Sequence, residues 1–450
     1  MTGWRAPVTA DEVQALSQLL GAAYDEAFSR RAVSDILSVG VELEFLLENA
    51  DGSDFMPSSD GAGVVQHIAS DLGLEVTNRL PDGTVIAARD PISGDTLCYE
   101  YTFGTIEWSL APSSSLRSLH QRGDRLIQKT RASLASFGLV LSDRASSASR
   151  WAHDFPVVPT LHYKAVQRHL AEHCVAPSLD ARRFTAFTAS CQTHIDANPS
   201  TAACLIDVLN DLAFVRASLF ANSRFLPGGR EGRTYVERDR LWQQSAFGMF
   251  PANVYMPPRR HGTMEGLLRY ECGRSIYHVV RGGQYLVFPP QPLIGLLRRQ
   301  TVDAVTPQGE PVLVELGPQD IVHSRNYADA VLTRFGTVEV RNDCQQPSGT
   351  WFGPAAFNLG IASNLSAAQA LINQFMSDGE ARSYRQMAVV QPYAHPIRKG
   401  WKAIDVIRRA LDVASEGLRR RGQDEAYLLD ELYERLERQR NPALDSHTLV

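Results

Sequence analysis

Two carboxylates, Glu42 and Glu44, alternate with apolar residues in the segment Gly40-Val41-Glu42-Leu43-Glu44. On a β-strand, residues two apart point to the same side, so both acids would lie on one face. Like charges on one face repel each other, and a divalent cation such as Mg²⁺, which prefers carboxylate oxygens, offsets that repulsion. The segment therefore favours either a cation site or a solvated acidic strand face.

A second stretch, residues 99–109, carries Glu100 and Glu107 within a run of aromatic and β-branched residues. Isolated acids in such a run cost free energy to bury unless they are paired or bound to a metal. These two acids are therefore candidates for the same cation site.

A third segment, residues 191–196, places Gln192, His194 and Asp196 in phase. A lone histidine is more often a hydrogen-bonded structural residue. With three polar groups on one face of an otherwise apolar strand, a functional role is as well supported as a structural one.

The fourth segment, residues 334–343, puts Glu339, Arg341 and Asp343 in phase. An acid beside an arginine on a sheet face can be a cross-strand ion pair. Next to other acidic strands, the same two residues could supply one metal ligand and one phosphate clamp.

The elements that must position these residues are helices and strands in irregular alternation. Helical periodicity is clearest at about 9–30, with Thr9 as N-cap, at 113–137, at 200–221 and in the last 50 residues. Period-two patterns lie at 39–47, 97–110, 187–196, 275–280, 312–316 and 335–341. The strand, helix, strand cadence of a doubly wound sheet is absent. We therefore expect an α+β fold with a largely antiparallel sheet.

Composition excludes several classes of protein. The chain has 450 residues, 44% hydrophobic and 21% charged, with a formal net charge of −5, so it has no electrostatic reason to bind nucleic acid or an anionic membrane. Its six cysteines stand singly, without zinc or disulfide spacing. The N-terminal twenty residues lack the apolar run of a secretory signal, and no stretch is long and apolar enough to span a membrane. We expect a cytoplasmic protein that acts on small molecules.

In their order along the chain, these motifs resemble the glutamate–cysteine ligases of the plant and bacterial type and their relatives, the carboxylate–amine ligases. The motifs of the common phosphate-loop nucleotide-binding proteins, zinc proteases and esterases are absent. The matching segments are Gly40 with Glu42 and Glu44, Gly104 to Ser109 with Pro112, Leu119-His120-Gln121, Gln192 to Asp196, Asn222-Ser223, Arg238 to Trp242, His323, Glu339 with Arg341 and Asp343, Ala414 to Leu418, and Asp424 to Leu428.

The resemblance implies an ATP- and Mg²⁺-dependent ligase that forms a γ-glutamyl amide from glutamate and the amine of cysteine or a related amino acid. The intermediate would be γ-glutamyl phosphate. The implied fold is glutamine-synthetase-like, with a funnel-like sheet, as one catalytic domain over residues 1–450 whose portion at about 355–440 is helical.

The resemblance also assigns roles to individual residues. Two or three Mg²⁺ ions would be held by Glu42, Glu44, Glu100, Glu107, Gln192 and Glu339. Glu339 and Arg341 would be catalytic, with Arg341 stabilising the transferred γ-phosphate. Glutamate or the nucleotide would be bound by Arg238, Arg240, Trp242, Gln192 and His194.

Two positions depart from the family pattern. His194 stands where many members have asparagine, and Gln243-Gln244-Ser245 stands where acidic residues are common. The second departure leaves the acceptor open. One alternative is therefore a carboxylate–amine ligase of a specialised biosynthetic pathway, with an acceptor other than cysteine or a donor other than glutamate. Another is a non-catalytic nucleotide-binding regulatory homologue, against which the retained acids and Arg341 weigh. The oligomeric state is not readable from the sequence.

Overall fold

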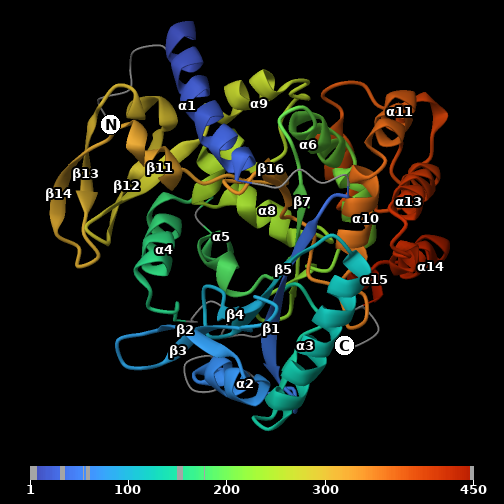
Figure 1. The fold of residues 1–450 in the computed structure, drawn as a ribbon, viewed down its shortest axis with the longest axis horizontal. Helices are drawn as coiled ribbons and strands as arrows, with labels where there is room; N and C mark the ends of the chain where they lie inside the picture. The colour runs from blue at the N-terminus through green and yellow to red at the C-terminus, as the bar shows by residue number, and fades with distance from the viewer. Residues whose placement is uncertain are drawn as a thin grey trace.

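The computed structural model describes residues 8–30, 36–53, 55–56, 61–148, 156–176 and 178–445. In this part of the chain the main sheet has nine strands, ordered β16-β17-β7-β1-β5-β4-β3-β2, and β6 pairs with β1. Their bounds are β1 (Val39–Asn49), β2 (Glu75–Arg79), β3 (Val85–Arg89), β4 (Thr96–Tyr99), β5 (Thr105–Ser113), β6 (Leu139–Leu141), β7 (Cys191–Asp196), β16 (Ala330–Leu332) and β17 (Thr337–Val340). Neighbouring strands are antiparallel throughout. The predicted α+β fold with a largely antiparallel sheet flanked by helices is confirmed (Figure 1).

Alternation along β1 divides the main sheet into two faces. Val41, Leu43 and Phe45 are buried on one side, and Glu42 and Glu44 belong to the other. Directly opposite residues of paired strands share a face. The side of the sheet that carries Glu42 and Glu44 is called the polar face below.

Helices cover the apolar side of the sheet. The helices that pack directly on its strands are α2 (Val64–Leu72), α3 (Leu116–Ala135), α6 (Ala202–Asp211) and α10 (Gly353–Ala362). Behind them, α13 (Ala403–Arg420) crosses α10 so closely that a Cβ on Gly417 would fall 1.9 Å from the carbonyl oxygen of Gly360. Glycine at this crossing lets the two backbones touch, which fixes the helix layer under the sheet.

The remaining helices surround this core. They are α4 (Leu161–His173), α5 (Leu179–Arg183), α7 (Ala213–Phe220), α8 (Glu237–Gln244), α11 (Leu365–Phe375), α12 (Ala381–Ala388), α14 (Asp430–Arg438) and α15 (Pro442–Asp445). Within the described part of the chain, no helix combines the length and the apolar character needed to cross a membrane. Residues 1–7, which belong to the N-terminal stretch interpreted above, lie outside the described residues. The single catalytic domain over residues 1–450 stays a prediction.

Two predicted elements are interrupted. The strand pattern at 97–110 forms the hairpin β4–β5, whose turn contains Tyr101 at a φ of 62°. The helix predicted over 200–221 breaks at Leu212 into α6 and α7. At that break the backbone carbonyl of Leu209 accepts a hydrogen bond from Arg216 at 3.4 Å, and the carbonyl of Ala213 accepts one from Arg385 at 2.5 Å. Buried guanidinium groups thus satisfy the backbone oxygens near the break.

A smaller unit lies beside the main sheet (Figure 1). It consists of α1 (Ala10–Ser29), α9 (Met264–Glu271) and the antiparallel strands β11 (Ser275–Arg281), β12 (Gln284–Pro292), β13 (Thr301–Val305) and β14 (Pro311–Glu315). We call it the small module. The predicted N-cap of α1 is confirmed, because the Thr9 side chain accepts a hydrogen bond from the Glu12 backbone at 3.2 Å. Leu16 and Leu20 of α1 pack into the hydrophobic core of this module.

Candidate cation site and substrate pocket

The polar face gathers residues that are far apart in the sequence. Strand pairing sets Glu44 opposite Glu107, Glu42 opposite Gln192, and His194 opposite Glu339. Since β7 lies between β1 and β17, Glu42 and Glu339, which are far apart in the sequence, lie on three neighbouring strands together with His194. The structure therefore brings together eight of the ten residues predicted from the strand segments, which are Glu42, Glu44, Glu100, Glu107, Gln192, His194, Glu339 and Arg341.

The tightest group consists of Glu42, His194 and Glu339. Each offers one ligand atom, and these atoms all lie within 4.8 Å of one another. The Nε2 atom of His194 lies 3.1 Å from a carboxylate oxygen of Glu42, and the guanidinium of Arg341 contacts the carboxylate of Glu339. Two carboxylates and an imidazole are a donor set that suits a divalent cation.

Charge compensation is visible in the pKa values of this group. Burial alone would raise the pKa of Glu42, but the hydrogen bond and charge of His194, with the charge of Arg341, bring it below its ordinary value. Burial would likewise lower the pKa of His194, yet Glu339 and Glu42 raise it. The protein thus stabilises these charges with its own cationic groups.

Three more acids extend the site along β1 and β5. The carboxylate of Glu44 accepts hydrogen bonds from the Ser190 backbone N–H and from the Gln192 amide, both at 2.7 Å. Opposite it, burial and then the charges of neighbouring acids, first Glu42, raise the pKa of Glu107 well above its ordinary value. Burial and then the charge of Glu44 raise the pKa of Glu100 to about 7.

Neutral groups, rather than cationic side chains, form the hydrogen bonds to the acids of this second group. Tyr163 of α4 donates a hydrogen bond to Glu100 at 2.9 Å, and Ser109 donates one to Glu107. Within the described residues, the amide oxygen of the buried Gln192 has no hydrogen-bond partner. Raised carboxyl pKa values and an unpartnered buried oxygen are the features that a bound cation would satisfy, so these residues fit the metal role predicted for them.

The residues predicted on α8 lie outside this cluster. Arg238 is buried and donates hydrogen bonds to the backbone oxygen of Arg341 at 3.1 Å and to Asn342 at 3.2 Å. Arg240 pairs with Glu237 and donates a hydrogen bond to Gln244 at 2.6 Å. Both arginines have protein partners, and their role in binding glutamate or nucleotide stays a prediction.

Trp242 contacts the site indirectly, through the ring of Tyr327. It stacks on Tyr327, with ring centroids 4.9 Å apart, and the guanidinium of Arg341 lies 5.2 Å from the centroid of the Tyr327 ring. A cation over an aromatic face is held by the electron density of the ring. Tyr327 therefore lies between Trp242 and Arg341 and contacts both.

The sequence pattern predicts that Asp343 shares a face with Glu339 and Arg341. In the structure it does not. β17 ends at Val340, and the backbone N–H of Arg341 bonds to the Asp329 oxygen at 3.0 Å. The Asp343 carboxylate instead accepts hydrogen bonds from Arg216 at 2.7 Å and from Asn358 at 2.9 Å, in the helix layer. The alternation stops because the strand ends, so the expected phase is wrong for this residue.

A cavity of about 520 Å³ opens onto Glu42, His194, Glu339 and Arg341. Its other walls come from α1 and from residues 321–335, so it lies where the small module meets the main sheet. Arg325 lines it as well and has no carboxylate partner within the described residues. Sequence reasoning missed Arg325 and Tyr163, because each stands alone in its segment without a motif.

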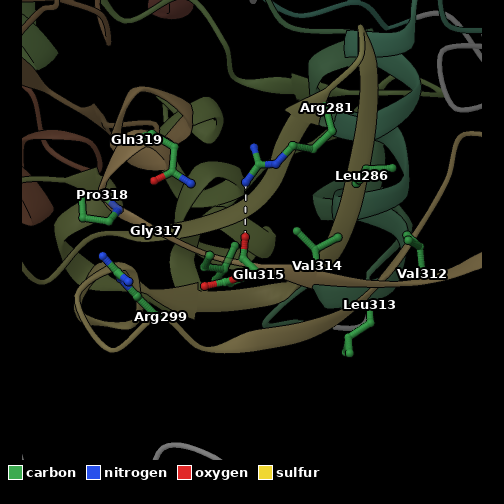
Figure 2. A pocket seen from close by; sticks show the side chains of 11 residues that line it. Arg281, Leu286, Arg299, Val312, Leu313, Val314, Glu315, Gly317, Pro318 and Gln319 are labelled. Atoms are coloured by element: carbon green, nitrogen blue, oxygen red, sulfur yellow. Dashed lines mark hydrogen bonds between the residues drawn. The ribbon is translucent and has the colours of Figure 1, made fainter.

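A second cavity of about 590 Å³ lies on the small module. Figure 2 shows Arg281, Arg299, Glu315 and Gln319 around it, with Arg281 donating a hydrogen bond to the Glu315 backbone oxygen at 3.3 Å. Arg281 is also paired with Asp320 at 2.7 Å. None of the predicted site residues lines this cavity.

Residues 38–440 match the family model described as glutamate-cysteine ligase family 2. Among curated proteins, none matches this chain in sequence.

Similar solved structures include a bifunctional glutathione synthetase from Pasteurella multocida, with 11% identity and a TM-score of 0.50, covering 99% of this chain and 51% of that one. A glutamate–cysteine ligase from Francisella tularensis in complex with AMP has 8% identity and a TM-score of 0.46, covering 92% and 84%. The complex of the prokaryotic ubiquitin-like protein Pup with its ligase PafA has 11% identity and a TM-score of 0.38, covering 92% and 65%. At these identities, the likeness to the Pasteurella structure shows a shared fold.

Proposed function

Because the chain belongs to glutamate-cysteine ligase family 2, and is thereby an ATP-dependent ligase that joins a carboxylate to an amine, we propose that its donor is glutamate. The product would be a γ-glutamyl amide, formed through γ-glutamyl phosphate with cysteine or a related amino acid as acceptor. The observation that carries this proposal is the convergence of Glu42, His194 and Glu339 beside Arg341 at one cavity.

The proposed reaction has two steps. A γ-carboxylate oxygen of glutamate attacks the γ-phosphorus of ATP, the bond from that phosphorus to the β–γ bridging oxygen breaks, and ADP leaves. The amine nitrogen then attacks the acyl carbon and loses a proton, the bond to the phosphate oxygen breaks, and inorganic phosphate leaves. The first step concentrates negative charge on the transferred group, so catalysis depends on positioning and electrostatic stabilisation.

The acids of the polar face would hold the metal ions. Glu42 and Glu339 with His194 form one candidate site, and Glu44, Glu100 and Glu107 with the Gln192 oxygen form the surroundings for one or two more. Mg²⁺ bound there would neutralise phosphate charge and orient the γ-phosphate.

Arg341 is the cationic side chain best placed to act on the transferred phosphoryl group. It lines the cavity, contacts Glu339 and rests on the Tyr327 ring, so its guanidinium is held at the cation site before substrate arrives. Preorganised charge of this kind costs no reorganisation during the reaction. Arg238 holds the backbone of Arg341 and acts as a positioning residue.

Product formation in a defined mixture tests the proposal. Purified protein is supplied with ATP, Mg²⁺, glutamate and each of the twenty amino acids in turn, while phosphate release and amide mass are measured. We expect phosphate release that requires both glutamate and an amine, and a product equal in mass to their sum minus water. Omission of glutamate, and the variant Arg341→Ala, are the negative controls.

The result also separates the proposal from its alternatives. Phosphate release with a donor other than glutamate would replace the donor assignment. Nucleotide binding without phosphate release, across all pairs with glutamate, would overturn the catalytic function and favour a regulatory protein.

A further inference from the structure

The cavity at the polar face is lined by more arginines than its own acids engage. Among the described residues, five arginines and three glutamates line it. Each of these glutamates has a basic partner, in the pairs Glu26–Arg30, Glu339–Arg341 and Glu42–His194. Arg274, Arg325 and Arg334 remain, and no glutamate of the described cavity wall pairs with them. The cavity therefore offers positive charge to a ligand.

Arg274 is the most deeply buried of these three arginines, with 6% of its surface exposed. Its Nε atom has no hydrogen-bond partner within the described residues. The carboxylate of Glu271 lies 3.7 Å from its guanidinium, which is beyond hydrogen-bond distance. A buried guanidinium with unmade hydrogen bonds costs free energy until another group supplies them. The fold thus leaves the hydrogen bonding of Arg274 incomplete.

Glu271 is held by neutral groups on both of its oxygens. Tyr24 of α1 donates a hydrogen bond to one oxygen at 2.6 Å, and the amide of Asn326 donates one to the other at 3.3 Å. Burial would lower the pKa of Arg274, but the charge of Glu271 raises it. Glu271 therefore keeps Arg274 charged while its own oxygens are bonded elsewhere, and donors of Arg274 stay available for a ligand.

Arg325 lies in surroundings that carry bases. Its guanidinium donates a hydrogen bond to the Val322 backbone oxygen at 3.4 Å. Burial and then the charge of Arg325 lower the pKa values of His162 and His278. His278 is 1% exposed, and neither of its ring nitrogens has a hydrogen-bond partner within the described residues. An arginine beside neutral histidines, without a carboxylate, creates a positive potential that attracts an anion.

The arginine pair fits an oxyanion. The planar guanidinium presents its donors in a fork that matches a carboxylate or a phosphate. Each substrate of the proposed reaction carries such a group in addition to the one that reacts: the α-carboxylate of glutamate, the carboxylate of an amino-acid acceptor, and the α- and β-phosphates of the nucleotide. An oxyanion beside the acids of the polar face would be repelled where no cation intervenes, whereas beside the arginines it is attracted.

We propose that Arg274 and Arg325 form an oxyanion-binding subsite of this cavity, which holds the non-reacting carboxylate or phosphate of a substrate. The inference rests on the proposed ligase function for the identity of that substrate. It adds two binding residues that no motif supplies, and it gives Tyr24, which lies outside residues 38–440, the role of holding Glu271 away from Arg274.

Calorimetry on the purified protein tests the subsite without turnover. The probes are glutamate, cysteine and the ATP analogue AMP-PNP, each with Mg²⁺. We expect Arg274→Gln and Arg325→Gln to weaken the binding of the same probe by about tenfold to a hundredfold, the usual effect of losing a hydrogen bond to a charged group. Arg269→Gln is the matched control, because this exposed arginine pairs with Glu265 on α9 and does not line the cavity. It should bind all three probes as the wild type does.

Truncated probes identify which oxyanion occupies the subsite. Isoglutamine lacks the α-carboxylate of glutamate, cysteamine lacks the carboxylate of cysteine, and adenosine lacks the phosphates. For the probe whose oxyanion is bound by the arginines, the truncated form should bind equally to the wild type and to Arg325→Gln. An equal loss for the full and the truncated probe would contradict oxyanion recognition, because the arginine would then act on another part of the ligand.

The two arginines differ in the risk of misfolding. Arg274→Gln removes the charge beside the buried Glu271 and is expected to lower stability, so Arg274→Lys, which keeps the charge and loses the fork, is measured as well. Arg325 has no carboxylate partner within the described residues, so Arg325→Gln should fold as judged by thermal unfolding. Wild-type affinity for all three probes in folded Arg325→Gln, or a wild-type protein that binds none of them, would overturn the proposal.

Turnover separates failure of this inference from failure of the proposed function. Probe binding that depends on both arginines, in a protein that forms no amide, would support the subsite and count against the ligase function. Amide formation with unchanged KM values for every substrate in Arg274→Lys and Arg325→Gln would overturn the subsite and leave the ligase function standing.

Discussion

Glu44 and Glu107 lie directly opposite each other on the paired strands β1 and β5, and both side chains are buried. Directly opposed like charges destabilise a strand pair, and burial increases the cost. The Gln192 amide and the Ser190 backbone N–H donate hydrogen bonds to Glu44, while burial and then the charges of neighbouring acids raise the pKa of Glu107. The fold therefore maintains an unfavourable contact that a cation can relieve.

Removal of one of these acids is expected to change stability in opposite directions with and without metal. Without metal, Glu107→Gln should raise the unfolding temperature at neutral pH above that of the wild type, because the cost of burying or protonating this carboxyl beside other acids is gone. Saturation with Mg²⁺ at about 100 times its Kd adds about 2.7 kcal/mol to a protein that binds it only when folded, so the wild type should gain more than the variant. Thermal unfolding in EDTA and in Mg²⁺ measures both effects. An exposed change, Glu310→Gln, serves as the control, and a wild type indifferent to Mg²⁺ would refute the cation site.

Loss of the guanidinium at Arg341 is expected to affect turnover far more than binding. Arg341→Ala should lower kcat by roughly 10²- to 10³-fold, the usual cost of removing one preorganised donor from a transition state. Glu339→Gln should have an effect of similar size, because it weakens the same cation site. Steady-state kinetics at saturating ATP and glutamate measure the loss. The exposed Arg117→Ala is the control, and wild-type rates in both site variants would remove these residues from the mechanism.

A variant of Arg238 shows whether this residue positions Arg341 or binds substrate. Its hydrogen bonds go to the Arg341 backbone and to Asn342, so Arg238→Met should lower kcat by misplacing Arg341 while leaving KM for ATP and glutamate close to that of the wild type. If Arg238 instead binds the glutamate carboxylate or the phosphates, KM rises and kcat is spared. The split between the two constants, with unfolding temperature as a check on folding, decides between these roles.

Asp343 is expected to matter for stability, because it lies in a buried network with Arg216, Asp329 and Asn358. Arg216 keeps Asp329 as a partner, but the buried donors of Arg216 and Asn358 that bond to Asp343 are left unsatisfied, so Asp343→Ala should lower the free energy of unfolding by about 3 kcal/mol. Arg117→Ala, which breaks an exposed pair, should cost less than about 1 kcal/mol. Urea unfolding monitored by circular dichroism gives both values, and equal costs would contradict the structural role.

Asp343 also shows where prediction of the site from strand alternation succeeds and where it fails. Alternation predicted the shared face of Glu42 and Glu44, and of Gln192 and His194, because a period of two depends only on the strand being formed. It failed at Asp343, since nothing local indicates that β17 ends at Val340. The end is set by tertiary contacts, among them the hydrogen bond from the Arg341 N–H to Asp329.

Residues outside strands were harder to predict. Tyr163 reaches Glu100 from α4, and Arg325 reaches the cavity from a loop, so their roles depend on how distant elements pack. The family resemblance supplied Arg238 and Trp242 by motif, but it could not tell that Arg238 bonds to the Arg341 backbone or that Trp242 stacks on the Tyr327 ring beside Arg341. Motifs identify which residues share a region, and packing decides which of them reach the cavity.

His194 was expected to bind substrate or nucleotide, and its position beside Glu42 and Glu339 makes it a potential metal ligand as well. Imidazole nitrogen suits transition metals, whereas Mg²⁺ prefers oxygen ligands. We therefore expect the wild-type enzyme to accept Mn²⁺ well, and His194→Asn, which replaces the ring with an amide oxygen, to lower the ratio of Mn²⁺- to Mg²⁺-supported activity about tenfold.

Activity titrations with each metal at fixed ATP and glutamate measure that ratio. His67→Asn, at a partly exposed histidine paired with Asp71, is the matched control and should leave the ratio unchanged. Electron paramagnetic resonance of bound Mn²⁺ gives a readout that does not depend on turnover, because loss of a nitrogen ligand alters the spectrum. An unchanged spectrum and an unchanged ratio in His194→Asn would mean that His194 only stabilises the charge of Glu42 and Glu339 and takes no part in binding the metal.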